Sequence, residues 1–392
     1  MLPSKYLHSL FILRIIRKLL VRLGECSRVT WKASPLTQVK IIITLYSVNI
    51  IFKKYNKNAT KNTMTMNQKK NFKLTPGYIT GLTQTDGSFS CGIKITAIKS
   101  IYFQPCFVIT ADLTSKFVLD KICKYFACGS VTISKLNHTA NFTVTKTDDL
   151  LNIIIPHFNL FPLFCAKLHA FELFKLIINE KIKNKNNINK EWKKDIVKKA
   201  ISMNKVTLRT PEKIDAIYDV LGVSNGSKLP LIENTKNTID TPVTDDNLAG
   251  IIDGDGCFWI TFEKTGRIRP GFSITMDTAT IPLLTKIKGL FNNVGSVKPD
   301  KPTYSSYMVY GLKQLIEEII PFMDLNPIFS ERAGHYAIFR QVCFMIKNEK
   351  PLTLKTKLEI VELAYNANKS GKRRNIPQAE YIKLLKNIHS DE

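Results

Sequence analysis

The segment Asn247–Lys264, "NLAGIIDGDGCFWITFEK", specifies the fold because Gly77–Lys94, "GYITGLTQTDGSFSCGIK", repeats its pattern. Each copy carries an Asp-Gly pair, so that Asp86 matches Asp255 at an offset of 169 residues. The similarity continues at an offset of 165, where "FVITADL" is followed by "FSITMDT" and "IIPHFNLFPL" by "IIPFMDLNPI". Chance does not keep register over so long a stretch. The sequence therefore predicts two copies of one domain.

Within each copy, the order of patterns predicts an α+β fold. Pro76–Thr85 has the start and stop signals of a helix, and the residues that follow alternate between apolar and polar, as in a strand. Bulky apolar residues at helical spacing come later, so helices are expected to cover one face of an antiparallel sheet and leave the other open. We expect four segments, namely a basic extension over 1–73, repeats over 74–209 and 247–387, and a polar linker over 210–246.

The composition indicates a folded protein with a polyanionic partner. The chain has 57 Lys plus Arg against 32 Asp plus Glu, a net charge of +25, and 44% hydrophobic residues. Its eight cysteines form no C-x-x-C pair, which argues against a secreted disulfide scaffold. The extension has one acid, Glu25, and is interpreted either as an organellar transit segment or as translated upstream sequence. Its apolar run Ile41–Phe52 is shorter than the about 20 residues that span a bilayer, so we expect no stable membrane insertion.

The small residues of the repeated segments predict a close helix pair. Gly81 and Thr85 in the first, like Gly250 and Gly254 in the second, are four residues apart and share a helical face. If these faces pack together, the two aspartates emerge at the same end and repel each other unless a cation lies between them. A hard divalent ion such as Mg²⁺ fits, and such an ion can activate a water molecule for phosphodiester hydrolysis.

The string "LAGIIDGDG" (Leu248–Gly256), with its looser partner "ITGLTQTDG" (Ile79–Gly87), resembles the motif of the LAGLIDADG homing endonucleases in their single-chain form. The resemblance implies two pseudo-symmetric αββαββα repeats, with saddle-shaped antiparallel sheets in the major groove and two motif helices at the repeat interface. It also implies cleavage of double-stranded DNA at a long, asymmetric target by a monomer. Mg²⁺ is the expected cofactor, and Mn²⁺ is expected to substitute for it.

Carried over by position, the resemblance makes Asp86 and Asp255 the metal ligands, with the carbonyl groups of Thr85 and Gly254 as auxiliary contacts. A basic residue late in the fourth strand supports catalysis in the family. Lys313 fits this role in the second repeat. In the first repeat that position is Asp148, and Lys146 lies two residues earlier. The chain also departs from the pattern at Gln84, where many relatives have an acid, whereas Asp253 keeps the acid in the second copy.

The polar residues of the alternating strand patterns are the candidate DNA contacts, because they face the open side of the sheet and a β-ribbon fits the major groove. For any one of them, solvated surface is the alternative, and the indole of Trp259 could instead be buried at the repeat interface. The candidates are Ser88, Ser90, Lys94, Trp259, Thr261, Glu263, Arg267, Arg269, Ser273 and Lys298.

Two other functions stay open on the sequence alone. The same fold serves as an RNA maturase for group I introns, so host intron RNA is an alternative partner. A DNA-binding relative without cleavage activity is the third possibility, although both motif aspartates are present. The bias toward Lys, Asn and Ile, with the habits of the family, favours an intron product of the mitochondrion over one of the chloroplast.

Overall fold

A computed structural model describes residues 72–184, 189–203, 211–223, 229, 231–234, 241–367 and 376–390. All of them fall within one compact unit, Thr63–Glu392. The expected extension over 1–73 lies outside the described residues, apart from its last two. The interpretations of its role therefore stay predictions.

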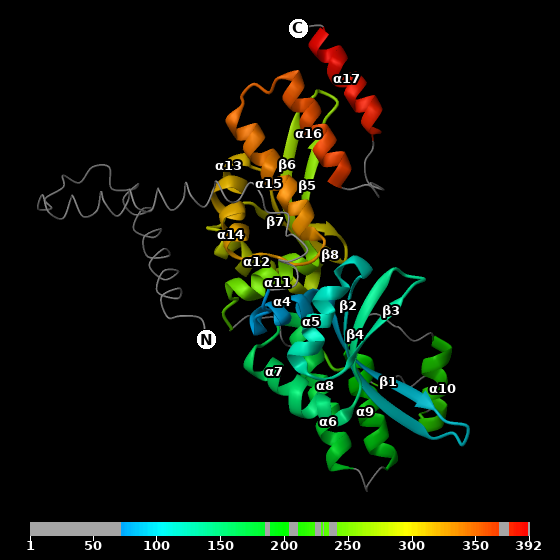
Figure 1. Cartoon of the computed structure of the whole chain (residues 1–392). Coiled ribbons are helices and arrows are strands. Elements are labelled where there is room, and N and C mark those ends of the chain that lie inside the picture. Colours follow the sequence, from blue (N-terminus) through cyan, green and yellow to red (C-terminus); the bar gives the residue numbers. More distant parts are fainter. Residues whose placement is uncertain are drawn as a thin grey trace, which may run out of the picture. The chain divides into compact units, whose positions relative to one another are not determined.

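The first repeat is built on a four-stranded antiparallel sheet in the order β1-β2-β4-β3 (Figure 1). Its elements are α4 (Pro76–Asp86), β1 (Gly87–Ile95), β2 (Ile101–Asp112), α5 (Lys116–Phe126), β3 (Ser130–Ser134), β4 (Thr139–Val144), α6 (Thr147–Asp149), α7 (Ile155–Leu160), α8 (Cys165–Lys183), α9 (Lys190–Ser202) and α10 (Pro211–Leu221).

The second repeat has the same plan, with the strand order β5-β6-β8-β7. Its elements are α11 (Asp245–Asp255), β5 (Gly256–Phe262), β6 (Ile268–Asp277), α12 (Ile281–Leu290), β7 (Ser296–Lys301), β8 (Tyr304–Val309), α13 (Leu312–Gln314), α14 (Ile320–Leu325), α15 (Arg332–Asn348), α16 (Leu354–Ala367) and α17 (Gln378–Ser390). The expected α+β class and its pair of matching repeats are thus confirmed.

Aromatic side chains on one face of each sheet form the cores. In the first repeat, Phe89 of β1 packs on Phe107 of β2 and on Phe171 and Phe174 of α8. All four rings are buried, whereas the alternate residues of β1 are at least partly exposed. Burying one face stabilises the repeat, because each aromatic side chain removes a large apolar area from water. The other face of the sheet stays open, as the alternation predicted.

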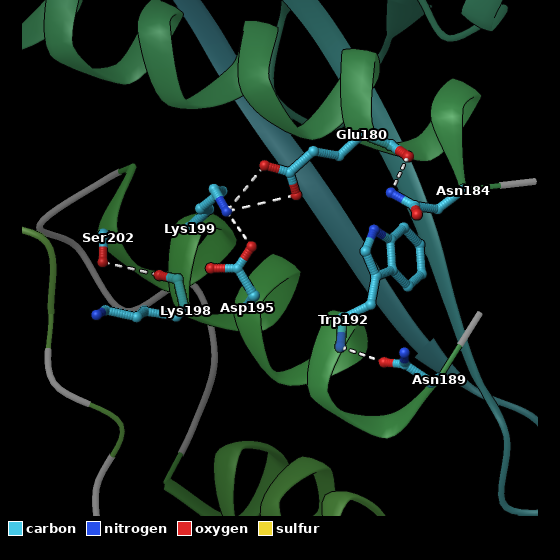
Figure 2. A network of polar contacts seen from close by, with 8 residues as sticks. All are labelled: Glu180, Asn184, Asn189, Trp192, Asp195, Lys198, Lys199 and Ser202. Atoms are coloured by element: carbon cyan, nitrogen blue, oxygen red, sulfur yellow. Dashed lines mark hydrogen bonds and ion pairs between the residues drawn. The ribbon is translucent and has the colours of Figure 1, made fainter. Parts of the chain in front are cut away.

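A charge cluster around the buried Lys199 joins α9 to α8 (Figure 2). The ammonium group of Lys199 lies 3.1 Å from a carboxylate oxygen of Glu180 and also pairs with Asp195. Beyond α9, Ile217 and Leu221 of α10 are buried in the first core. The segment 210–246, expected to be a linker, therefore also contains a packed helix.

The last two helices cover the far end of the β5–β6 hairpin. The ring of Phe262 packs on the rings of Tyr365 and Tyr381, and the Tyr381 hydroxyl donates to the Glu263 carbonyl at 3.1 Å. These contacts fix the distal end of the second sheet. Across the described part of the chain, none of the helices combines the length and apolar character needed to cross a bilayer.

Candidate active site

The two motif helices, α4 and α11, begin with the same type of cap. The hydroxyl of Thr75 accepts a hydrogen bond from the Tyr78 N–H at 3.2 Å, and that of Thr244 accepts one from the Asn247 N–H at 3.1 Å. Such side-chain acceptors satisfy N–H groups that lack partners in the first turn of a helix. The caps occupy matching positions, so both helices start in the same register of the repeat.

Glycines bring the backbones of α4 and α11 into contact. A Cβ atom on Gly81 would collide with the carbonyl oxygen of Asn247, and one on Gly250 would collide with that of Tyr78. The Asn247 side-chain amide donates to the Gly77 carbonyl at 3.0 Å and links the helices near their start. Figure 1 shows the pair side by side. Only glycine permits this approach at the two crossing positions.

The two helices run in the same direction. Gly77 lies against Asp246 near their first turns, and Gly254 lies against Thr85 near their last turns. The aspartates that end α4 and α11 therefore emerge together at one end of the pair. The twin carboxylates that the repeated motif predicted thus share one region of the molecule.

The environment of Asp86 and Asp255 opposes the ionisation of both. Burial raises the pKa of Asp86 to about 6, although the positive charge of Arg332 counteracts part of this effect. Burial also raises the pKa of Asp255 to about 7, and the negative charge of Asp86 adds to the shift. Neither carboxylate has a hydrogen-bond donor among the described residues. Ionising both carboxylates therefore carries an electrostatic cost.

Two cations flank the carboxylates, and neither was predicted from the sequence. Lys167 of α8 donates to the Gly87 carbonyl, directly after Asp86. Arg332 of α15 donates from Nε to the Gly256 carbonyl at 3.0 Å, directly after Asp255. Both cations lower the pKa of both acids. The offset between Lys167 and Arg332 is 165 residues, the same offset that aligned the surrounding segments, so this register was the signal that could have identified them.

The donor set at this end of the helices fits a hard divalent cation. Among the described residues, neither carboxylate has a hydrogen-bond donor, and their raised pKa values mean that a bound cation would relieve an existing electrostatic cost. Within the described ranges, no three His, Cys, Asp or Glu side chains are grouped to hold a metal ion. Mg²⁺ suits such a sparse set, because it commonly keeps waters and binds substrate phosphates beside one or two carboxylates.

The expected catalytic lysines lie beyond the ends of the fourth strands, which corrects their placement late in those strands, and their role in catalysis stays a prediction. β4 ends at Val144, so Lys146 lies beyond it, where its 70%-exposed side chain approaches Asp149 at 3.8 Å. β8 ends at Val309, and Lys313 lies on α13. Neither lysine influences the pKa of a motif aspartate. The chain continues past each strand into a helical turn, so both residues leave the sheet.

Asp253 and Gln84 hold matching loops in place. The Asp253 carboxylate accepts hydrogen bonds from the Phe329 N–H at 2.7 Å, from the Ser330 N–H at 3.0 Å and from the Tyr78 hydroxyl across the helix pair. Gln84 accepts from the Phe164 N–H at 3.0 Å and donates to the Phe164 carbonyl at 3.3 Å. These loops lead directly into α15 and α8, so the clamps fix the start of each helix that carries a flanking cation.

Most of the candidate DNA contacts are dispersed over the strands and hairpins of the two sheets. Ser88 and Ser90 alternate with the buried Phe89 along β1, and both are half-buried. The exposed candidates are Lys94 in the first repeat and Thr261, Arg267, Arg269 and Lys298 in the second. These side chains are accessible to a bound duplex, and their role in DNA binding stays a prediction.

The surroundings of four candidates could not be predicted from the alternating pattern alone. The Arg269 guanidinium pairs with the carboxylate of Glu263 across the hairpin, so these two side chains partly neutralise each other. Ser273 is buried, with 8% of its surface exposed, and is less accessible than the sequence pattern implied. Trp259 lies on the open side of β5 and contacts Gly271 of β6, so it is not buried at the repeat interface.

The fold and the site are those of a two-repeat endonuclease. Its repeats are joined through parallel motif helices, and an acidic centre lies at the shared end of these helices. The model of the LAGLIDADG endonuclease family matches residues 79–178 and 248–343. The chain therefore belongs to the LAGLIDADG endonuclease family.

Fungal relatives align with most of the chain. "Probable intron-encoded endonuclease 2" of Neurospora crassa is 30% identical over 306 residues, which cover 74% of this chain and 64% of that protein. "Probable intron-encoded DNA endonuclease 1" of Mycosarcoma maydis is 27% identical over 65% of this chain and 94% of that protein. The chain thus spans slightly less than two thirds of the Neurospora relative and nearly all of the Mycosarcoma relative.

Solved structures share the fold. I-SmaMI bound to its uncleaved DNA target in the presence of calcium ions has a TM-score of 0.65 at 24% identity, and the match covers 77% of this chain and 100% of that one. The LAGLIDADG homing endonuclease I-GzeII in complex with its DNA target has a TM-score of 0.63 at 24% identity, with 75% and 98% covered. These likenesses support the two-repeat architecture.

Proposed function

We propose that this protein is a homing endonuclease that recognises a specific sequence in double-stranded DNA and hydrolyses both strands with a divalent metal ion, Mg²⁺ in the cell. The observation that carries the proposal is the close parallel packing of α4 on α11, which brings Asp86 and Asp255 to the same end of the motif helices. Family membership and the names of the fungal relatives support the same activity.

Asp86 and Asp255 would hold the metal, with the carbonyl groups of Thr85 and Gly254 as further candidate donors. A bound Mg²⁺ would supply positive charge for activating water and stabilising the leaving oxygen of the phosphodiester. Lys167 and Arg332 lie beside the same carboxylates and would neutralise charge that develops on the phosphate. Hydrogen bonds to the Gly87 and Gly256 carbonyls hold these cations in place before substrate binds.

The open faces of the two sheets would contact the DNA. Their strands are suited to the major groove, and the net charge of +25 favours binding to a polyanion. The two faces carry different side chains at matching positions, such as Ser90 and Trp259, so the two halves of the target are expected to differ. Both motifs lie in one chain, which supports action as a monomer.

An intron in a mitochondrial genome is the proposed source. The names of both fungal relatives describe them as intron-encoded, and the chain is rich in Lys, Asn and Ile. A role in RNA splicing would be detected as binding of the protein to its host intron.

The test is cleavage of DNA after selection of a target from a random library with the full-length protein. A plasmid carrying the selected site should be linearised with Mg²⁺ but not with EDTA. Asp86→Asn and Asp255→Asn should abolish cutting, whereas Asp215→Asn, an exposed change on α10, should cut normally. Absence of cleavage at every selected site, together with rescue of splicing of a host intron, would replace this proposal with the maturase function.

A further inference from the structure

The open face of the second sheet carries an apolar cluster that the proposed chemistry does not use. It consists of Trp259 on β5, Met308 on β8 and Tyr310, one residue beyond β8. The neighbours of Trp259 along the chain, Phe258 and Ile260, pack into the cores on the opposite face. The indole therefore belongs to the face that is proposed to meet DNA.

Gly271 creates the place in which the indole lies. It is the partner of Trp259 in the β5–β6 register, and a Cβ atom there would be 2.5 Å from the indole Cε2 atom. The Trp259 ring consequently lies over the backbone of β6 and meets the Tyr310 ring edge-on, with centroids 5.7 Å apart and planes at 74°. Tyr310 is 55% exposed, and its hydroxyl lies 3.0 Å from the Met308 sulfur.

The first repeat has no such aromatic pair at the matching positions. The offset of 169 residues relates Trp259 to Ser90, and the offset of 165 relates Gly271 to Cys106. The offset of 165 also places Thr145 opposite Tyr310. The cluster is therefore a feature of the second repeat, and the common fold does not require it.

We propose that Trp259 and Tyr310 form an apolar platform that recognises the 5-methyl group of a thymine in the half-site bound by the second repeat. This inference rests on the proposed function. In the major groove, thymine is the base that presents a methyl group, and apolar side chains read it by contact. A rigid ring supported by Gly271 and Tyr310 presents apolar surface there with little conformational freedom to lose.

The position of the platform predicts which base pair is read. Trp259 lies four strand positions beyond Asp255, about 13 Å at roughly 3.3 Å per residue. At about 3.4 Å per base pair along one strand, the thymine should lie about four base pairs outward from the scissile phosphates. The matching position in the other half-site should show no dependence on a methyl group.

The experiment replaces single thymines of the selected target by deoxyuridine, which removes only the methyl group. At the predicted position, this change should weaken binding by the wild-type protein about fourfold, the effect of one buried methyl-sized group. Trp259→Ser, which installs the residue of the first repeat, should bind the thymine and deoxyuridine targets equally. Gly271→Ala should have the same effect, because it displaces the indole.

Controls separate this inference from folding and from the proposed function. Tyr304→Ser removes an exposed aromatic ring at the other end of β8 and should retain the fourfold preference for thymine. Thermal unfolding and affinity for random DNA check the fold of each variant. The inference is overturned if the wild-type protein binds the thymine and deoxyuridine targets equally, or if Trp259→Ser keeps the preference for thymine. Neither result contradicts the proposed endonuclease function. Failure to select any target would instead reject the proposed function and this inference with it.

Discussion

Thr85 fills the space that the missing side chain of Gly254 leaves between the motif helices. Its hydroxyl donates to the Leu82 carbonyl at 2.9 Å, and a Cβ atom on Gly254 would collide with that hydroxyl oxygen. The bulk of one residue is thus matched by the absence of a side chain on the other. This complementarity holds the ends of α4 and α11 together next to the two aspartates.

Gly254→Ala should therefore destabilise the protein by about 1–3 kcal/mol, the usual cost of overpacking. Combining it with Thr85→Gly should restore part of this loss, because the colliding atoms are removed. Urea unfolding of the single and double variants measures the coupling between the sites. Gly289→Ala is the control, since the added carbon meets no atom within 4 Å beyond its chain neighbours and the backbone of its own helix, and the change should be neutral or stabilising. Additive effects of the two changes would contradict the proposed packing.

Without metal, stability should fall as the pH rises from about 4 to about 7. The pKa values of Asp86 and Asp255 rise from 3.8 in the unfolded chain to about 6 and about 7 in the folded protein. The folded state therefore holds protons that the unfolded state has released, and this advantage is lost as the pH passes the folded values. Asp255→Asn should be more stable than wild type at pH 8, by on the order of 2 kcal/mol, and not at pH 4. Chemical denaturation in EDTA tests this, and a difference independent of pH would show that the buried charge is not its cause.

Lys167→Met and Arg332→Met should slow cleavage much more than they weaken DNA binding. Loss of one preorganised charge beside the reacting group typically lowers the rate about 10²–10³-fold. Single-turnover cleavage and equilibrium binding separate the two effects. Lys146→Met and Lys313→Met should cleave at nearly the wild-type rate. If these last two variants were the slow ones, the assignment of the flanking cations would be wrong.

Asp253→Ala should be the most destabilising change at the loop clamps. It leaves the Phe329 and Ser330 N–H groups and the Tyr78 hydroxyl without their acceptor, at a cost of about 3–5 kcal/mol. Gln84→Ala removes one donor and one acceptor and should cost about 1–2 kcal/mol. Urea unfolding curves compare the two variants. Equal losses of unfolding free energy would show that the carboxylate of Asp253 contributes no more to stability than the amide of Gln84.

Much of the fold could be predicted because the chain contains two copies of one domain, whose sequences can be compared with each other. The match between Asp86 and Asp255 aligned the repeats, and period-two alternation separated the core face of each sheet from its open face. The helix α10 was harder to predict, because its few buried residues lie between polar stretches. Its packing depends on the neighbouring α9, a tertiary contact that local patterns do not encode.

The acidic part of the site was predictable from sequence, whereas its cationic part was not. The aspartates stand at the ends of recognisable motif helices. Lys167 and Arg332 lie further along each repeat, and only the folded structure brings them beside the carboxylates. The offset of 165 related them to each other without indicating a role. The position of Trp259 likewise depended on Gly271, a residue on another strand.

Metal binding by the two motif aspartates can be observed in a crystal structure of the protein with its selected DNA and Mn²⁺, read by anomalous scattering. We expect metal peaks about 2.1 Å from carboxylate oxygens of Asp86 and Asp255, next to the scissile phosphates. Peaks confined to other sites, or aspartates that both lie away from the phosphates, would refute a hydrolytic centre at the end of the motif helices.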